Sequence, residues 1–410
     1  MNVPSMYPIE LRRSIGTLAL ALYGIGVTVG AGIYVLVGEV ARVADRSAPL
    51  SFVLAALVIA PTAASFAELA SRYPRSAGEA LYVKMAFGST GLARLIGLMV
   101  ASAGIISAAA VAIGAAGYLR EFVDIPKPAI ASAIILALGA IAAWGVVQSV
   151  VFAVIISIFE VGALIVIVAL AAPTMPDPLG DLAQVWPHAG GGSWSGIAAG
   201  LLLAFFAFVG FEDMVNMAEE VKRPQRAIPI AIALTLVATG LLYLVVVFVA
   251  TSAMPAQELA NSDAPLAGLY ARVTGGNPAV ITSIAIGSTV NTVLIQMVMA
   301  ARVFYGLANE GALPRLLGRV SASTQTPLIA TGVSVILVLV LVLFFPIDML
   351  ARATSAIILA IFIAVNLSLL ALKRRGDEAP AFGVPLIVPA VGIVLSAAVF
   401  LLELWRLMQG

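Results

Sequence analysis

The feature that most constrains this chain is a series of long apolar runs, separated by charged residues or by clusters of Pro and Gly. A helix needs about 20 apolar residues to cross a bilayer. Eleven runs approach or exceed that length, and they span residues 15–38, 48–70, 88–119, 129–146, 149–172, 195–218, 227–252, 279–306, 328–345, 349–372 and 384–405. Hydrocarbon offers no hydrogen-bond partners, so a spanning segment of this kind must satisfy its backbone internally as a helix. The sequence therefore predicts an all-α polytopic membrane protein, with one transmembrane domain over residues 1–410 and about eleven transmembrane helices.

The composition supports this class and excludes several chemistries. Of 410 residues, 62% are hydrophobic and only 10% are charged, against about 25% charged in a soluble domain. The chain has no cysteine and a single histidine, His188, which excludes thiolate and histidine metal sites and cysteine nucleophiles. No GxxxxGK[ST] motif is present, so ATP hydrolysis through a P-loop is excluded. We expect no metal and no cofactor.

Glycines interrupt the first apolar run. The stretch GIGVTVGAGIY, residues 24–34, has glycine at four of its first nine positions, which are Gly24, Gly26, Gly30 and Gly32. Each glycine costs a helix interior up to about 1 kcal/mol relative to alanine. One interpretation is close helix packing, because Gly26 and Gly30 form a GxxxG pattern. The other is a deliberate break in the helix.

The sixth run carries a matching interruption. Gly210 lies in its middle and is followed by Glu212 and Asp213. Corresponding breaks in two halves of a membrane protein are typical of an inverted repeat with a binding site at mid-membrane. The N–H groups freed at the positive end of a half-helix suit a carboxylate, and freed carbonyls suit a cation. The two breaks together favour a binding site.

Four stretches resemble, in order and spacing, the amino acid–polyamine–organocation superfamily of amino acid permeases. They are GVTVGAGIYVLVG, SFAELASRYPRSAGEALYV, FFAFVGFEDMVNMAEEVKRPQRAIPIAI and AARVFYGLANEGALP, at residues 26–38, 65–83, 205–232 and 300–314. The resemblance implies a LeuT-type 5+5 inverted repeat with discontinuous helices 1 and 6. It places repeat one at about 15–172, repeat two at about 195–372, and an extra C-terminal helix at about 384–405.

The same resemblance implies a set of substrate-binding residues. Backbone N–H groups at the first break hold the substrate α-carboxylate, carbonyls at the second break hold its α-amino group, and aromatic rings line or gate the pocket. The residues implied are Thr28, Gly30, Ala31, Gly32, Phe205, Phe208, Val209, Gly210 and Phe211. Packing in the core or against lipid is the alternative for each phenylalanine.

Glu160 lies near the middle of the fifth run. A carboxylate at that depth costs at least about 2.5 kcal/mol on insertion scales, so it is either protonated or paired with a cation. In several proton-coupled members of the family, a lysine occupies what looks like the same position and stands in for a sodium ion. Here a titratable acid could carry a coupling proton instead. A purely structural, protonated Glu160 is the alternative.

A sodium site is a second hypothesis for coupling. By the alignment of the glycines, the resemblance implies that Gly26 and Val29 supply carbonyls and that Ser288, Thr289 or Thr292 supply hydroxyls. A hard cation needs several oxygen ligands, and this set offers enough of them. The alternative is that these hydroxyls bond to carbonyls of their own helix.

The acids that follow the second break leave the substrate charge open. If Glu212 faces the pocket, it favours a cationic amino acid or a polyamine; if it faces other helices, Arg94 or Arg302 are candidate partners. Asp213, about 100° further round the helix, is not expected to share the face of Glu212. The segment after them, with Glu219 and Glu220 near Pro224, is expected to be a solvated cytoplasmic loop, with a gating ion pair as the alternative.

These observations predict a permease: a secondary active transporter of amino acids, working by alternating access and coupled to protons or acting by exchange. The alternatives are a polyamine or cationic amine transporter of the same fold and a sodium-coupled amino acid symporter. A channel needs rings of carbonyls or charges, and an intramembrane enzyme would have only Glu160 and Glu212 as an acidic pair, so neither class is favoured. The expected partners are a small amino acid and the lipid bilayer, with no nucleic acid and with H⁺ or Na⁺ as the coupling ion. Lys and Arg are more frequent in the segments that lie on the same side of the membrane as the N-terminus. The positive-inside rule therefore predicts a cytoplasmic N-terminus, and we expect a plasma-membrane protein.

Overall fold

The computed structural model describes residues 13–76, 78–120, 122–175, 177–187, 193–262, 264–376 and 380–409, and His188 lies outside these ranges. The α-helices are α1 Thr17–Ala44, α2 Ala48–Arg72, α3 Gly78–Phe87, α4 Thr90–Leu119, α5 Lys127–Trp144, α6 Val146–Ala171, α7 Pro178–Gln184, α8 Trp194–Ala207, α9 Pro224–Ala253, α10 Ala256–Ala260, α11 Pro265–Thr274, α12 Ala279–Asn309, α13 Leu328–Phe344, α14 Ile347–Arg375 and α15 Ile387–Gln409. Four 3₁₀ segments accompany them: η1 Asp45–Ser47, η2 Ala172–Thr174, η3 Phe211–Glu220 and η4 Arg315–Gly318.

Each of the eleven predicted runs corresponds to a helix, with α8 and η3 together forming the sixth. Within the described ranges, nine helical stretches are long and apolar enough to cross a membrane. Two shorter apolar helices, Leu328–Phe344 and Ile387–Leu402, complete the set. The only extended pairing among the described residues is one isolated bridge between Ile15 and Val221. The prediction of an all-α polytopic membrane protein is confirmed.

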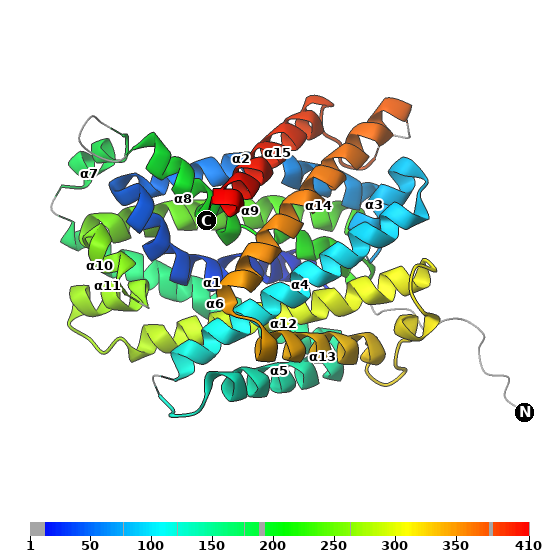
Figure 1. The fold of residues 1–410 in the computed structure, drawn as a ribbon, viewed down its shortest axis with the longest axis horizontal. Coiled ribbons are helices and arrows are strands. Elements are labelled where there is room, and N and C mark those ends of the chain that lie inside the picture. The colour runs from blue at the N-terminus through cyan, green and yellow to red at the C-terminus, as the bar shows by residue number, and fades with distance from the viewer. Residues whose placement is uncertain are drawn as a thin grey trace, which may run out of the picture.

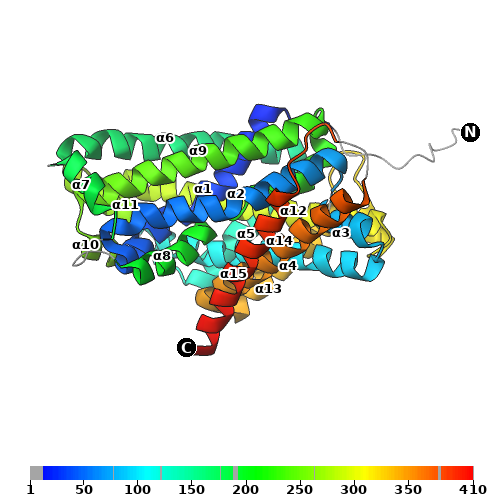
Figure 2. The same ribbon diagram turned by 90° about the horizontal axis from the view of Figure 1, so that it is seen from above.

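The long helices run along one axis of the molecule and leave small helices at its two ends (Figures 1 and 2). One end carries α3, and the opposite end carries α7, α10 and α11, so we call these the α3 end and the α7 end. The first helix, α1, lies at the centre and packs against α6, α8, α9 and α12. Around it, α2 packs on α9, α4 on α12 and α5 on α13. Both predicted breaks therefore lie inside the bundle, where protein surrounds them.

The two central helices are interrupted where their glycines predicted. In α1 the backbone leaves helical geometry at Gly30, with φ 1° and ψ −131°. The sixth span ends its α-helix at Ala207, turns through Gly210 with φ 121°, and continues as the tighter 3₁₀ helix η3. A φ of this size is one that residues with a side chain rarely adopt. The second break therefore requires glycine.

We expect Gly210→Ala to lower the free energy of unfolding by about 1–3 kcal/mol, the usual cost of a non-glycine residue in such a conformation. The added Cβ would also lie 3.1 Å from the Val27 side chain. Thermal unfolding of the purified protein measures the change. Gly162→Ala in α6 is the control, because its Cβ meets nothing within 4 Å and alanine favours a helix interior. Equal melting temperatures for the two variants would contradict the prediction.

Candidate functional site

One hydroxyl joins the two breaks. Tyr243 of α9 is fully buried, and its hydroxyl oxygen lies 2.6 Å from the carbonyl of Thr28 and 2.9 Å from that of Ala207, so its one hydrogen is shared between the two acceptors. Its ring packs edge-on against Phe208, with centroids 5.0 Å apart. Carbonyls freed at a helix break need such a partner, because an unpaired buried carbonyl is costly. The sequence analysis missed Tyr243, and the only signal for it is a polar group in the apolar run LLYLVVVFV.

The glycines of α1 also serve close packing. A Cβ at Gly26 would overlap side chains of α6 and α12, and one at Gly30 would overlap the Thr292 hydroxyl. A Cβ at Gly32 would lie 2.9 Å from the Cα of Ala207 in α8. The close-packing interpretation therefore holds alongside the break. A larger residue at Gly32 would push α1 away from α8 rather than fill an open pocket.

The predicted aromatic residues form packed clusters around the second break. Phe205, Phe208 and Phe211 are all buried. The ring of Phe362 in α14 packs against that of Phe205 with centroids 5.9 Å apart and against that of Phe211 with centroids 5.6 Å apart. Phe208 packs on Tyr243 instead. A small cavity also lies beside the second break; Phe362 lines it, and none of the three predicted phenylalanines does.

Glu160 lies where α6 meets α1 and α12. Its side chain is fully buried, and its Oε1 accepts a hydrogen bond from the Ser288 hydroxyl at 2.5 Å. Its Oε2 has no hydrogen-bond partner among the described residues. Nor does any Lys or Arg in the described ranges form an ion pair with it. The structure thus brings together Glu160 and Ser288, two residues that the sequence analysis assigned to rival coupling sites.

The other hydroxyls of the sodium hypothesis bond within their own helix. Thr289 donates to the Ile286 carbonyl at 2.8 Å and Thr292 to the Ser288 carbonyl at 3.2 Å. In α1 the hydroxyl of Thr28 does the same, donating to the Gly24 carbonyl at 2.8 Å. Val29 is fully buried in the core. These bonds match the structural alternative for Ser and Thr in membrane helices.

A small cavity lies beside the second break, between α3, α4, η3, α12 and α14. It leaves about 10 Å³ for the centre of a water molecule, which is room for about one water. Its lining residues include Glu79, Val100, Ala103, Gly104, Ser107, Val209, Glu212, Asp213, Gln296, Met299, Thr354, Ile358, Ile361 and Phe362. A wider, more open depression lies at the α7 end, and no predicted site residue lines it.

Three carboxylates border this cavity. Glu212 Oε2 accepts from the N–H of Gly210 at 2.9 Å and so caps the break. Asp213 Oδ2 accepts from the Gln296 amide at 2.7 Å, and Glu79 Oε1 from the Asn216 amide at 3.3 Å. Burial raises the pKa of the Glu79 carboxyl, which lies outside the spanning segments, to about 8. Glu79 was absent from the predicted site, because a single acid between two apolar runs carries no signal of burial.

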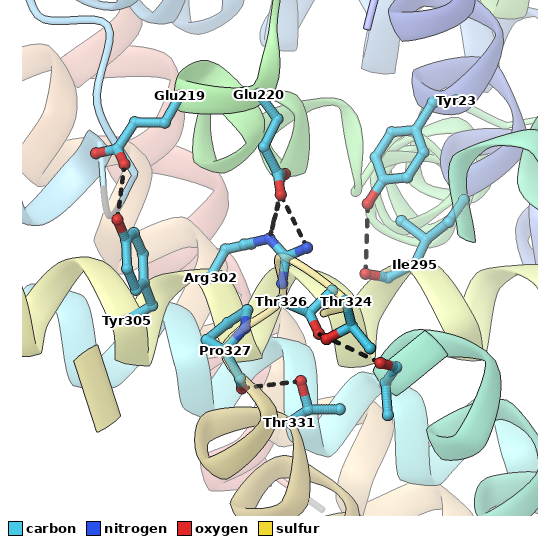
Figure 3. A network of polar contacts seen from close by, with 11 residues as sticks. Tyr23, Glu219, Glu220, Ile295, Arg302, Tyr305, Thr324, Thr326, Pro327 and Thr331 are labelled. Atoms are coloured by element: carbon cyan, nitrogen blue, oxygen red, sulfur yellow. Dashed lines mark hydrogen bonds and ion pairs between the residues drawn. The ribbon is translucent and has the colours of Figure 1, made fainter. Parts of the chain in front are cut away.

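Two expectations about these acids were wrong. Glu212 and Asp213 do share a cavity, because it lies at the start of η3, where both residues of the first turn approach it. Glu220 is not in a solvated loop but is fully buried. The cause is Arg302 of α12, whose Nε lies 3.0 Å and 3.1 Å from the Glu220 carboxylate oxygens (Figure 3). Arg302 therefore pairs with Glu220 and not with Glu212.

Glu219 ties the same segment to two other elements at the α3 end. It accepts a hydrogen bond from the Tyr305 hydroxyl of α12 at 3.3 Å (Figure 3). Its other oxygen accepts from the N–H of Ser76, in the loop before α3, at 3.2 Å. With the buried pair of Glu220 and Arg302, these contacts fix the end of η3 against α12 and the α3 loop.

Comparison with known proteins identifies the family. A family model described as amino acid permease matches residues 15–405, nearly the whole chain. The chain therefore belongs to the amino acid permease family, and with its apolar helices it is a multi-pass membrane protein.

Individual relatives carry different substrate names. A vacuolar cationic amino acid transporter from Arabidopsis thaliana is 30% identical over 92% of this chain, which spans 66% of that relative. A branched-chain amino acid permease from Bacillus subtilis is 27% identical over 96% of this chain and 88% of its own length. A methylthioribose transporter from the same bacterium is 29% identical over 97% and 89%.

The hydroxyl of Tyr243 generates a prediction. Tyr243→Phe keeps the ring but leaves the carbonyls of Thr28 and Ala207 without this donor, so we expect a loss of about 1–3 kcal/mol in the free energy of unfolding. Tyr23→Phe is the control, because Tyr23 is equally buried but makes one long hydrogen bond of 3.5 Å, to the Ile295 carbonyl. Thermal unfolding of both variants decides; a loss as large for Tyr23→Phe would contradict a special role for Tyr243.

Proposed function

We propose that this chain is a secondary active transporter of amino acids that works by alternating access around its two broken helices. The observation that carries the proposal is the interruption of α1 at Gly30 and of the sixth span at Gly210, joined by Tyr243 at the bundle centre. Breaks of this kind are tolerated in a membrane only where protein or a ligand completes the backbone. Membership of a permease family supports the same reading.

The substrate backbone would bind between the two breaks. The α-carboxylate would accept from the N–H groups of Gly30, Ala31 and Gly32. At the second break, Gly210 donates its N–H to Glu212 and its carbonyl accepts from the Asp213 N–H at 3.1 Å. Among the described residues, this leaves the carbonyls of Phe208 and Val209 for the α-amino group.

Alternating access needs two halves that move against each other. The packing of α2 on α9, α4 on α12 and α5 on α13 pairs helices of matching rank in the two proposed repeats and so supports the 5+5 inverted layout. The α3 end would face the cytoplasm of a plasma membrane, because Lys and Arg are more frequent in the loops there, as the positive-inside rule requires.

We place the coupling proton on Glu160. A fully buried carboxylate whose Oε2 has no partner and which forms no ion pair within the described ranges is most stable in its protonated form. The Ser288 hydroxyl faces this carboxylate, which makes it the natural group to hold the charged form after proton release. A sodium ion at the same hydroxyl is the rival and gives a different outcome in the test below.

Binding is tested by ligand-induced stabilisation, which grows with the logarithm of ligand concentration over Kd. We expect α-amino acids to raise the melting temperature of the purified protein, and their methyl esters to lose the effect because the ester cannot accept as a carboxylate does. Amino acids and polyamines are compared at pH 5.5 and 7.5, with and without sodium. Stabilisation by polyamines alone would overturn the carboxylate assignment, and a requirement for sodium would overturn the proton.

Glu160→Gln tests the coupling residue. Glutamine keeps a hydrogen-bond partner for Ser288 but cannot exchange a proton, so uptake into proteoliposomes should no longer respond to an imposed pH gradient while amino acid exchange continues. Ser288→Ala is the companion variant: it removes the hydroxyl that bonds Glu160 and leaves the titratable carboxyl, so its uptake should still respond to the pH gradient. An unchanged response to the pH gradient in Glu160→Gln would make Glu160 a structural residue.

A further inference from the structure

The cavity beside the second break is bordered by three buried acids from two elements. The side chains of Glu79, Glu212 and Asp213 are 1%, 4% and 3% exposed. Glu79 Oε2 and Glu212 Oε1 have no hydrogen-bond partner among the described residues. Because both residues line the cavity, these two oxygens are acceptors left for something that enters it.

The described lining brings no positive charge to balance these acids. The cavity is walled by α3, α4, η3, α12 and α14, and the three acids are the only charged residues in its lining. The nearby amide of Gln296 donates to Asp213 and carries no charge.

Other buried acids at the α3 end form ion pairs with Arg or Lys. Glu220 pairs with Arg302 at 2.9 Å, and Glu68 pairs with both Arg72 and Lys373 at 2.8 Å. The partly exposed Glu310 pairs with Lys84 at 2.5 Å. The cavity acids lack such a partner within the described ranges, so their missing counter-charge is a property of this cavity and not of the whole end.

Three carboxylates around one small, buried space cannot all ionise without a cation, because each raises the cost of charging its neighbours. A guanidinium or ammonium in the cavity would offset that cost and bring three to five N–H donors to the free oxygens. The remaining wall includes Val100, Ala103, Met299 and Ile358, an apolar surface of the kind along which lysine and arginine stems pack.

We propose that this cavity is the side-chain subsite for a cationic amino acid. Glu79 and Asp213 are the residues that determine specificity, because Glu212 also caps the helix break at the Gly210 N–H and its replacement would disturb the break itself. The proposal rests on the transport function proposed above and adds the class of side chain. The α-amino group would lie at the carbonyls of Phe208 and Val209, and Val209 also lines the cavity, so one substrate reaches both places. The present volume holds about one water, so α4 or α14 must move outward for the side chain to enter.

The test uses arginine and citrulline, which have nearly the same shape and differ in the charge of the side chain. Dissociation constants of both are measured on the purified full chain, on Glu79→Gln and on Asp213→Asn. We expect each variant to bind arginine about tenfold or more weakly, the usual effect of losing a hydrogen bond to a charged group, and to bind citrulline within about twofold of the original chain. Glu258→Gln is the control, because this acid is 49% exposed and pairs with Arg272 at the α7 end.

Four outcomes decide between the proposals. Equal weakening of arginine and citrulline, or no weakening in either variant, overturns the subsite. Binding of neutral amino acids without arginine overturns the subsite and leaves the transport function standing. If no α-amino acid binds, agmatine is tested, because it keeps the guanidinium and lacks the carboxylate. Agmatine binding that both variants weaken supports a cation site and overturns amino acid transport. No binding of agmatine either overturns both. Both variants preserve side-chain shape, and if one fails to fold the other decides.

Discussion

The structure depends on how the backbone groups freed at two helix breaks are satisfied inside a membrane. Hydrocarbon offers them nothing, so the bundle must supply every partner itself. The Tyr243 hydroxyl lies within hydrogen-bond distance of one carbonyl from each broken helix. The Glu212 carboxylate accepts a hydrogen bond from the Gly210 N–H. Packing α1 directly on α8 through Gly32 makes this shared arrangement feasible, because it brings the two interrupted helices into contact at the level of their breaks.

Buried acids in this chain fall into two groups that imply different roles. One group has a basic partner, as Glu220 has in Arg302 and Glu68 has in Arg72. Removing one partner of such a pair leaves an uncompensated charge, so these pairs resist change. Glu160 and the cavity acids lack a basic partner among the described residues, and each carboxylate is free to exchange a proton or meet a cationic ligand. The second group is therefore where transport chemistry is expected.

The sequence predicted the helices and the breaks because both depend on residues that are neighbours along the chain. Hydropathy over about 20 residues sets each span. Gly210 marks the second break because glycine is the residue that readily adopts the positive φ found there. The prediction failed where a residue's role depends on a distant partner. The residues around Glu220 in the sequence do not indicate that its carboxylate is buried against Arg302, which lies far along the chain. Likewise, Tyr243 and Glu79 belong to the site only through helices that meet them in space. The assumed helical spacing that separated Glu212 from Asp213 also failed, because it ignored the break beside them.

The contacts at the α3 end connect these features to movement. Glu219 and Glu220 fasten the end of η3 to α12 and to the loop before α3 (Figure 3), and the start of the same ten-residue segment carries Glu212 and Asp213. If the proposed transport opens a path at this end by separating η3 from α12, that separation would also move the cavity wall, because η3 and α12 both line the cavity. A ligand that binds the cavity acids more tightly in one arrangement therefore biases the whole segment toward it, since a ligand shifts an equilibrium only by its differential affinity. Under the proposed mechanism, the η3 contacts and the acids without a basic partner on this one short segment would couple ligand occupancy to access.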